Sequence, residues 1–178
     1  MRKLICGMML MVCFACIKQA VAQAGIYGQV TAAKLSAANT SWMYGPTLGL
    51  YYDAGHGVVA LGLDARASFL GRGNTNGAGS DESLRTGLVG VRVAVTPHVL
   101  PFKPYVEALG GFGSLTVGQG AARTSATHFT YQFLGGIDFT VFPRVDWRVV
   151  EFSYGRLSGL GDSFAPKTVS TGLVFRLP

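Results

Sequence analysis

The chain has 178 residues, of which 13% are charged and 49% are hydrophobic, and its mean hydropathy is +0.34. This length allows one domain of ordinary size, and the low charge excludes both a disordered tail and a highly charged soluble surface. The 25 glycines follow no triplet period, which excludes a collagen-like chain.

The first 24 residues are predicted to be a secretory signal peptide. Arg2 and Lys3 precede an uncharged run over residues 4–17, and mostly small residues follow at 20–24. This run of 14 residues is shorter than the roughly 20 that a membrane-spanning helix needs. We therefore expect cleavage before Gly25 and a mature domain over residues 25–178. A membrane anchor and a lipoprotein modified at Cys16 are the alternatives.

Removal of the signal peptide changes the chemistry of the mature chain. All three cysteines leave with it, so disulfides and cysteine-bound metals are excluded from the mature domain. Three of the 15 basic residues also leave, which gives 12 basic against 9 acidic residues and a net charge near +3. An excess this small and scattered does not indicate nucleic-acid binding.

After Gly25 the apolar residues recur at every second position, which is the period of a half-buried β-strand. In residues 42–52, for example, Trp42, Leu48 and Tyr52 share one face. Eight such strands are predicted, at residues 25–35, 42–52, 58–69, 84–96, 104–115, 128–141, 147–157 and 167–178. Strands of globular proteins usually have about five or six residues, whereas transmembrane strands need about nine to eleven.

The connections between these strands alternate in character. Those after the second, fourth and sixth strands are compact, at residues 53–57, 97–103 and 142–146. Those after the odd-numbered strands are mostly longer and rich in Gly, Ser, Asn and Thr, at residues 36–41, 71–83, 116–127 and 158–166. Tight turns at one rim and looser polar loops at the other are typical of an up-and-down barrel with a periplasmic and an exterior rim.

Aromatic residues gather near both ends of the predicted strands, as in the two girdles of a membrane barrel. The predicted turn-side girdle contains Tyr27, Tyr52, Phe102, Tyr105, Phe139, Phe142, Trp147 and Phe175. The predicted loop-side girdle contains Trp42, Tyr44, Phe69, Phe112, Phe129, Tyr131 and Tyr154.

Charged and small residues share one face of the strands, and aliphatic residues take the other. The interior of an eight-stranded barrel is only wide enough for side chains to fill it. We therefore predict an all-β fold, an eight-stranded antiparallel up-and-down transmembrane β-barrel with a filled polar lumen and an apolar face toward lipid. The alternative with the same period is a soluble barrel or sandwich that buries the apolar face.

Seven charged residues are predicted to face the lumen. They are Asp64, Arg66, Arg92, Glu107, Asp138, Glu151 and Arg176. Because an unpaired buried charge costs several kcal/mol, we expect a mutually compensated network that fills and stiffens the barrel; a gated polar path is the alternative. Arg92 and Glu107 flank one turn at similar depth, which predicts a cross-strand pair.

Two residues do not fit the simple pattern. Arg148 has the parity of the outward face, so we expect it to extend toward the periplasmic edge. Pro46 lies inside the second strand and lacks an amide hydrogen, so we expect a bulge or a local distortion there.

The chain resembles the eight-stranded outer-membrane β-barrel family, which includes OmpA-like and OmpX-like proteins. The resemblance lies in "LVGVRVAVT" followed by "PFKPYVEALGGFG", in "FLGGIDFTV" with "WRVVEFSYGRL", and in the closing "VSTGLVFRLP". It implies residence in the bacterial outer membrane after export through the periplasm, and insertion by the barrel-assembly machinery. It also implies contact with outer-membrane lipid and lipopolysaccharide, and we expect a monomer without a cofactor.

No catalytic or metal-binding motif is recognised. His56, His98 and His128 have no ligand at metal-binding spacing, and no Ser-His-acid arrangement can be read near Ser125 or around the last loop. Cations at the predicted exterior rim have the chemistry to bind lipopolysaccharide phosphates. They are Arg72, Arg85, Arg123, Arg156 and Lys167, partly balanced by Asp81, Glu82 and Asp162.

The sequence therefore predicts a small outer-membrane barrel with an envelope-structural or surface-interaction role that is neither an open pore nor an enzyme. A secreted or periplasmic soluble barrel that binds an apolar ligand is one alternative. A lipid-modifying outer-membrane enzyme is another.

Overall fold

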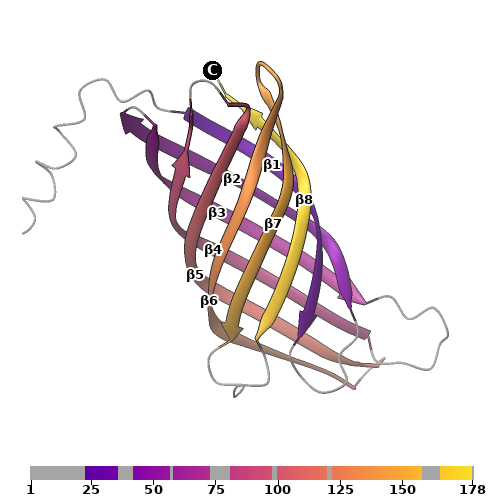
Figure 1. Cartoon of the computed structure of the whole chain (residues 1–178). Helices are drawn as coiled ribbons and strands as arrows, with labels where there is room; N and C mark the ends of the chain where they lie inside the picture. Colours follow the sequence, from indigo (N-terminus) through magenta and orange to yellow (C-terminus); the bar gives the residue numbers. More distant parts are fainter. Residues whose placement is uncertain are drawn as a thin grey trace, which may run out of the picture.

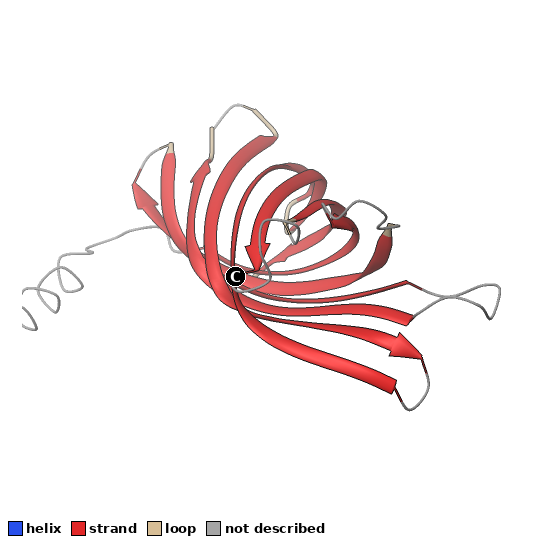
Figure 2. Cartoon of the chain, turned by 90° about the horizontal axis from the view of Figure 1, so that it is seen from below, coloured by secondary structure: helices blue, strands red, loops and turns tan. Residues whose placement is uncertain are grey.

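All regular structure in the described part of the chain is β-strand (Figure 2). The computed structural model describes residues 23–35, 42–56, 58–72, 81–97, 100–119, 122–157 and 165–177. Within these ranges, no helix is long and apolar enough to cross a membrane. The predicted signal peptide falls almost wholly outside them, so its assignment stays a prediction.

Eight strands form one closed antiparallel barrel in which each strand pairs with its neighbours in the sequence and β1 pairs with β8 (Figure 1). The strands are β1 (Gln23–Leu35), β2 (Met43–His56), β3 (Val59–Arg72), β4 (Asp81–Val95), β5 (Phe102–Gln119), β6 (Ala122–Phe142), β7 (Val145–Leu157) and β8 (Pro166–Arg176). The predicted fold and strand number are confirmed.

The barrel has two different ends. We call the end that holds the β2–β3, β4–β5 and β6–β7 connections the turn end; β1 begins and β8 finishes there (Figure 1). The opposite end, where β1–β2, β3–β4, β5–β6 and β7–β8 connect, is the loop end. The strands cross the barrel wall obliquely, as closure of a sheet into a barrel requires.

β5 and β6 exceed the lengths that the sequence pattern indicates by more than the other strands do. β5 has 18 residues and β6 has 21, and they stay paired up to Gln119 and Ala122. Most of the loop predicted at residues 116–127 is therefore an extension of this hairpin. Gly, Ser and Thr in this segment indicate a loop by composition, but the backbone pairing overrides that preference.

The apolar face of the strands points out of the barrel. Val30 and Val89, from the middle of β1 and β4, are 66% and 64% exposed, and Leu61, nearer the turn end of β3, is 64% exposed. The soluble alternative requires these aliphatic residues to be buried, so the exposures contradict it. An apolar outer wall is suited to contact with hydrocarbon rather than water.

The lumen is filled by four layers of side chains. From the turn end, they are a small charged cluster at the rim, a larger charged and aromatic layer, a layer of hydroxyl groups, and an apolar layer. The apolar layer at the loop end is formed by Ala33, Met43, Leu70, Leu84 and Leu115.

A bulge in β7 changes which side chains face the lumen. The pairing with β6 passes from Ile137–Val150 to Asp138–Arg148, so β7 contains one extra residue. The pairing with β8 shifts at the same point. The inward positions of β7 are therefore even-numbered before the bulge, at Asp146 and Arg148, and odd-numbered after it, at Glu151 and Ser153. An extra residue in a strand of period two requires this change.

Of the bulge or local distortion predicted at Pro46, the structure has a local distortion and no bulge. The β1–β2 register runs unchanged through the Val30–Pro46 pair. Pairing with β3 is interrupted between Tyr44 and Thr47 and resumes in the same register. The missing amide hydrogen thus interrupts the ladder on one side only and does not add a residue.

Candidate functional site

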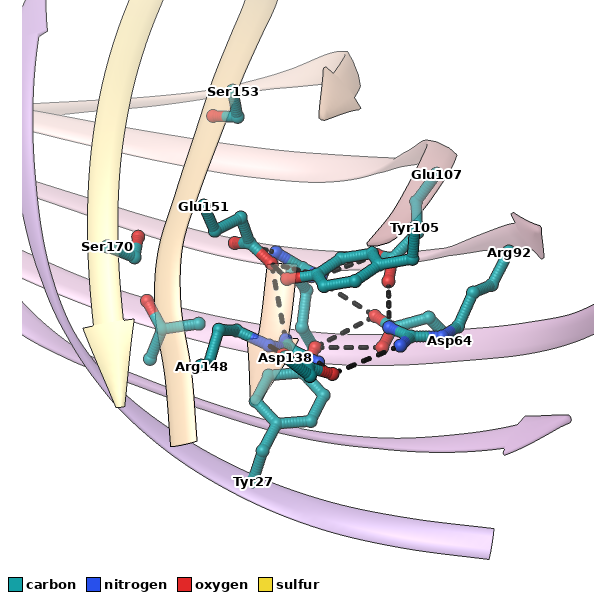
Figure 3. A network of polar contacts seen from close by, with 12 residues as sticks. Tyr27, Asp64, Arg92, Tyr105, Glu107, Asp138, Arg148, Glu151, Ser153 and Ser170 are labelled. Carbon is teal, nitrogen blue, oxygen red and sulfur yellow. Dashed lines mark hydrogen bonds and ion pairs between the residues drawn. The ribbon is translucent and has the colours of Figure 1, made fainter. Parts of the chain in front are cut away.

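The candidate site is the charged and aromatic layer that crosses the lumen (Figure 3). It contains three guanidinium groups and five carboxyl groups from β2 to β7. These are Arg66, Arg92, Arg148, Asp53, Asp64, Glu107, Asp138 and Glu151, all of them buried. We call these eight residues, together with Tyr27, Tyr51 and Tyr105, the lumen network.

Arg66 joins three different strands. Its Nε lies 3.1 Å from Asp64 Oδ1 on the same strand, its Nη1 lies 2.8 Å from Glu151 Oε1 on β7, and its Nη2 lies 2.5 Å from Glu107 Oε2 on β5. The planar guanidinium presents five N–H donors in a rigid fork, which suits it to several carboxylates at once. Arg66 therefore ties opposite walls of the barrel together.

Arg92 bonds to carboxylates on both of its flanks. Its Nη1 donates to Glu107 Oε1 at 2.6 Å, and these two residues are register partners on β4 and β5. Its Nη2 donates to Asp138 Oδ2 at 3.3 Å. Its Nε lies 3.3 Å from Asp53 Oδ2, an ion pair whose geometry is not that of a hydrogen bond.

Arg148 is the most buried cation of the network, with no exposed surface. Its Nε and Nη2 donate to the two oxygens of Asp138 at 2.8 and 3.2 Å, a bidentate pair. Its Nη1 donates to Glu151 Oε2 at 3.2 Å. The prediction that Arg148 extends outward is therefore wrong, because the β7 bulge reverses the parity on which it rests.

Three tyrosines insert their rings between these charges. Tyr27 OH donates to Asp64 at 2.9 Å and Tyr105 OH donates to Glu151 at 2.6 Å. Guanidinium carbons lie over the rings, with Arg92 at 3.9 Å from the Tyr105 centroid and Arg148 at 4.3 Å from the Tyr27 centroid. Such desolvated cation–π contacts stabilise buried guanidinium groups.

Each of the three rings lies over a glycine directly across the strand pair. The register pairs are Tyr27–Gly49, Gly25–Tyr51 and Tyr105–Gly136. A Cβ atom at any of these glycines would collide with the tyrosine ring. Two of these tyrosines, Tyr27 and Tyr105, were predicted to belong to the membrane girdle, and that prediction is wrong. The sequence signal for inward tyrosines was a glycine at the opposite position of the neighbouring strand, because the ring occupies the space that the glycine leaves free.

A second charged cluster lies at the turn end. Lys103 Nζ is 3.1 Å from Asp146 Oδ2, and Arg176 Nη2 is 3.1 Å from Asp146 Oδ1. Asp146 is buried, whereas the two cations are partly exposed. Arg176, one of the seven predicted lumen residues, thus lies at the rim, separate from the other six.

A layer of hydroxyl groups lies on the loop-end side of the lumen network. Thr31 Oγ1 is hydrogen-bonded to Thr47 Oγ1 at 2.8 Å and to Ser170 Oγ at 2.9 Å, so the bonds run from β8 through β1 to β2. A cavity of about 30 Å³ adjoins these groups. It has room for about two water molecules, which need roughly 10–15 Å³ each on this scale.

The network brings together most of the residues expected in the lumen. Asp64, Arg66, Arg92, Glu107, Asp138 and Glu151 lie in mutual contact. Sequence reasoning missed Asp53 and Arg148 as members. The signal for Arg148 was the spacing of Trp147 and Phe152, both outward, because two outward residues five positions apart require one extra residue in a strand of period two.

The chemistry of the network is that of mutual neutralisation. Each of the five carboxylates lies within 3.3 Å of a guanidinium nitrogen. Carboxylates held in this way do not present a free acid or base to a substrate. Among the described residues, no group of three or more His, Cys, Asp or Glu is arranged to hold a metal ion.

Four of the predicted exterior cations lie at the loop end with described side chains. Arg72, Arg85, Arg156 and Lys167 are exposed there. The side chains of Arg123, Asp81 and Glu82 and the whole of Asp162 lie outside the described residues, as do the side chains of His56 and His98. Nε2 of His128 is buried without a hydrogen-bond partner in the described part of the chain.

Comparisons with known proteins agree with the barrel architecture. The sequence model of the family described as "Outer membrane protein beta-barrel domain" matches residues 5–176. None of the curated proteins matches the sequence.

Several solved structures share the fold at low sequence identity. Neisserial surface protein A superposes with a TM-score of 0.60 at 15% identity, covering 90% of this chain and 100% of that chain. Ail, the attachment invasion locus protein of Yersinia pestis, gives a TM-score of 0.62 at 14% identity with the same coverage. A major outer membrane protein from Thermus thermophilus gives 0.52 at 11% identity, covering 88% and 100%.

Proposed function

Because the chain belongs to the outer membrane protein β-barrel family and is a small barrel of the bacterial outer membrane, we propose that it acts there as a closed structural or surface-interacting element. It conducts no solutes and catalyses no reaction. The observation that carries this proposal is the lumen network, which joins strands from opposite walls and fills the barrel.

The closed lumen follows from the energetics of the network. Removing one partner of a buried ion pair costs about 3–5 kcal/mol, because a charge is left uncompensated. Opening a continuous path requires several of the contacts of Arg66, Arg92 and Arg148 to break together. The apolar layer at the loop end is a second obstacle to ions.

Conductance in a planar lipid bilayer tests closure. We expect the wild-type protein to give no discrete conductance steps. The variant Arg92→Ala/Glu107→Ala/Leu84→Ala/Leu115→Ala removes two charged register partners and two register partners of the apolar layer, so it opens both obstacles and is expected to give measurable steps. A matched control, Val91→Ala/Val106→Ala, changes the same two strands on the outer face and is expected to stay silent. Regular openings in the wild-type protein would contradict the proposal.

The absence of catalysis is proposed from the engagement of the network's acids with guanidinium groups. Incubation with lipid A and with phospholipid, followed by mass spectrometry of the lipids, is expected to show no product. A new lipid species formed by the wild-type protein would instead support the alternative of a lipid-modifying enzyme.

We further propose that the turn end faces the periplasm and the loop end faces the exterior, in a monomer exported through the periplasm. Insertion by the barrel-assembly machinery, and an annulus of outer-membrane lipid and lipopolysaccharide, belong to the same proposal. The turn-end β2–β3 and β6–β7 connections have two residues each, whereas the loop-end β1–β2, β3–β4 and β7–β8 connections have seven or eight, and this difference supports the orientation.

Single introduced cysteines can test this orientation directly. All three natural cysteines lie in the predicted signal peptide, so the mature chain is expected to have no thiol of its own. A single cysteine is introduced at exposed Arg72 on the loop end or at exposed Arg144 on the turn end. An impermeant maleimide applied to intact cells is expected to label Arg72→Cys and to spare Arg144→Cys. The opposite labelling would reverse the orientation.

A further inference from the structure

A groove of about 710 Å³ lies on the outer wall of the barrel across β4 to β8. Two neighbouring rows of outward side chains form it, each continuous through the strand register. One row is Val93, Val106, Gly135, Phe152 and Val169, and the other is Val91, Ala108, Phe133, Tyr154 and Lys167. Ala108 and Gly135 are too small to fill the space between the flanking aromatic rings.

The groove climbs across the wall from the turn-end half to the loop end. On β4 it begins at Val93, two residues before the end of this strand at the turn end, and it reaches Lys167, the second residue of β8 at the loop end. This diagonal course follows from the oblique strands, since a row at right angles to them is oblique as well (Figure 1). Its size lies within the roughly 300–1,000 Å³ typical of ligand pockets.

Two lysines lie side by side at the loop end of the groove. Lys34 on β1 is the register partner of Lys167 on β8, and both side chains are exposed. Like charges at directly opposite positions destabilise a sheet. Trp42, the residue before β2, and Tyr154 supply the aromatic rings expected where a barrel wall meets lipid headgroups.

No carboxylate of the described outer wall balances these lysines. The six carboxylates whose side chains are described, Asp53, Asp64, Glu107, Asp138, Asp146 and Glu151, are all buried inside the barrel. The cationic pair is therefore complementary to an external anion, and the adjoining groove is complementary to a hydrocarbon chain. These two features together describe a phosphorylated lipid.

We propose that this groove is a specific site for a phosphorylated glycolipid of the exterior leaflet, of the lipid A type. A phosphate lies between Lys34 and Lys167, each of which donates charge-assisted hydrogen bonds to it. One acyl chain follows the groove over Ala108 and Gly135. The sugar ring stacks beside Trp42. The assignment to the exterior leaflet rests on the proposed orientation of the barrel.

Tryptophan fluorescence can report binding at the site directly. The chain has two tryptophans, so the Trp147→Phe variant leaves Trp42 as the sole reporter. This variant, folded in phosphatidylcholine vesicles, is titrated with lipid A, with dephosphorylated lipid A and with phosphatidylglycerol. We expect saturable binding of lipid A, and binding of the other two that is weaker by at least roughly tenfold.

Charge variants separate the site from general attraction to the loop end. Lys34→Gln/Lys167→Gln is expected to weaken lipid A binding roughly 10- to 30-fold, since each cation near an anionic surface contributes about one factor of five. The matched control Arg72→Gln/Arg85→Gln removes two exposed loop-end cations of β3 and β4, away from the groove, and is expected to change binding less than about twofold. Equal losses in both variants would overturn the proposal, as would no loss in the first.

A third variant tests the groove without changing charge. Gly135→Leu fills the floor and is expected to weaken lipid A binding as strongly as loss of the lysines, whereas Gly87→Leu, on the outer face of β4, is expected to leave it unchanged. Equal binding of phosphatidylglycerol would show a site for any anionic lipid. A doubled mass in native mass spectrometry would show that a second copy covers the groove. Either result overturns the proposal.

The tests of the barrel itself remain separate. A heat-dependent shift in gel migration verifies folding of every variant, and conductance and maleimide labelling verify closure and orientation. If those results stand and Lys34→Gln/Lys167→Gln binds lipid A normally, the glycolipid site alone is refuted.

Discussion

Replacement of Arg148 by Met tests whether the β7 bulge directs this cation into the lumen. The variant keeps most of the side-chain volume and removes the guanidinium, which makes three hydrogen bonds to Asp138 and Glu151. Both carboxylates stay buried when the cation is lost. Loss of one partner of a buried ion pair costs about 3–5 kcal/mol.

The expected loss lies at the lower end of that range because neighbouring groups remain. Asp138 keeps Arg92 at 3.3 Å, and Glu151 keeps Arg66 at 2.8 Å and the Tyr105 hydroxyl at 2.6 Å. We therefore expect Arg148→Met to lower the free energy of unfolding by about 3 kcal/mol. The double variant Arg148→Met/Asp138→Asn removes the uncompensated charge as well and is expected to recover about 1–2 kcal/mol of this loss.

Equilibrium unfolding in urea, with the protein in lipid vesicles, measures these differences through tryptophan fluorescence and gel migration. Arg85→Met is the control, because Arg85 is exposed on the outer face of β4; its effect should stay within about 0.5 kcal/mol. If Arg148→Met is no more destabilising than Arg85→Met, Arg148 points outward as its sequence parity indicates, and the bulge is wrongly placed.

Three further substitutions test other parts of the barrel by the same unfolding measurement. Tyr105→Phe keeps the ring under Arg92 and removes the hydroxyl that donates to Glu151 at 2.6 Å, so we expect a loss of about 1.5–3 kcal/mol; no change would mean that the hydroxyl bonds equally well in the unfolded chain. Gly136→Ala is expected to lose about 1–3 kcal/mol because its Cβ collides with the Tyr105 ring, whereas Gly135→Ala, which points outward on the same strand, is tolerated; similar effects of the two would contradict the seating of the ring. Val89→Arg places a charge on the outer wall in the middle of β4 and is expected to cost about 2–4 kcal/mol in a bilayer; tolerance of it would argue against burial of this face in lipid.

The strand pattern alone was sufficient to predict the barrel, since its period of two and its alternating connections are local properties. Trp42, Leu48 and Tyr52 were assigned to one face from the sequence, and all three are outward in the structure. Arg92 and Glu107 were expected to pair from their places beside one turn, and their side chains lie 2.6 Å apart.

The sequence pattern predicted only some of the residues of the lumen network. Parity counted from one end of β7 assigned Glu151 inward and Arg148 outward, because it ignored the odd spacing of the aromatic residues Trp147 and Phe152 in "WRVVEF". Tyr27 and Tyr105 were assigned to a girdle by their position near strand ends, although their parity matched the inward face. The glycines opposite them were interpreted as small lumen residues, and not as positions that leave space for a tyrosine ring.

The amino-acid pattern by itself determined that eight long strands close into a barrel with an apolar exterior and charges inside, because burial of alternate residues is a property of each strand alone. Tertiary structure decided which charges meet. The bulge in β7, the shear of the closed sheet and the Tyr–Gly contacts between strands depend on how neighbouring strands are aligned. That alignment sets the distances among Arg66, Arg92 and Arg148 and their carboxylates. It also places Lys34 beside Lys167 at the loop end of the outer-wall groove.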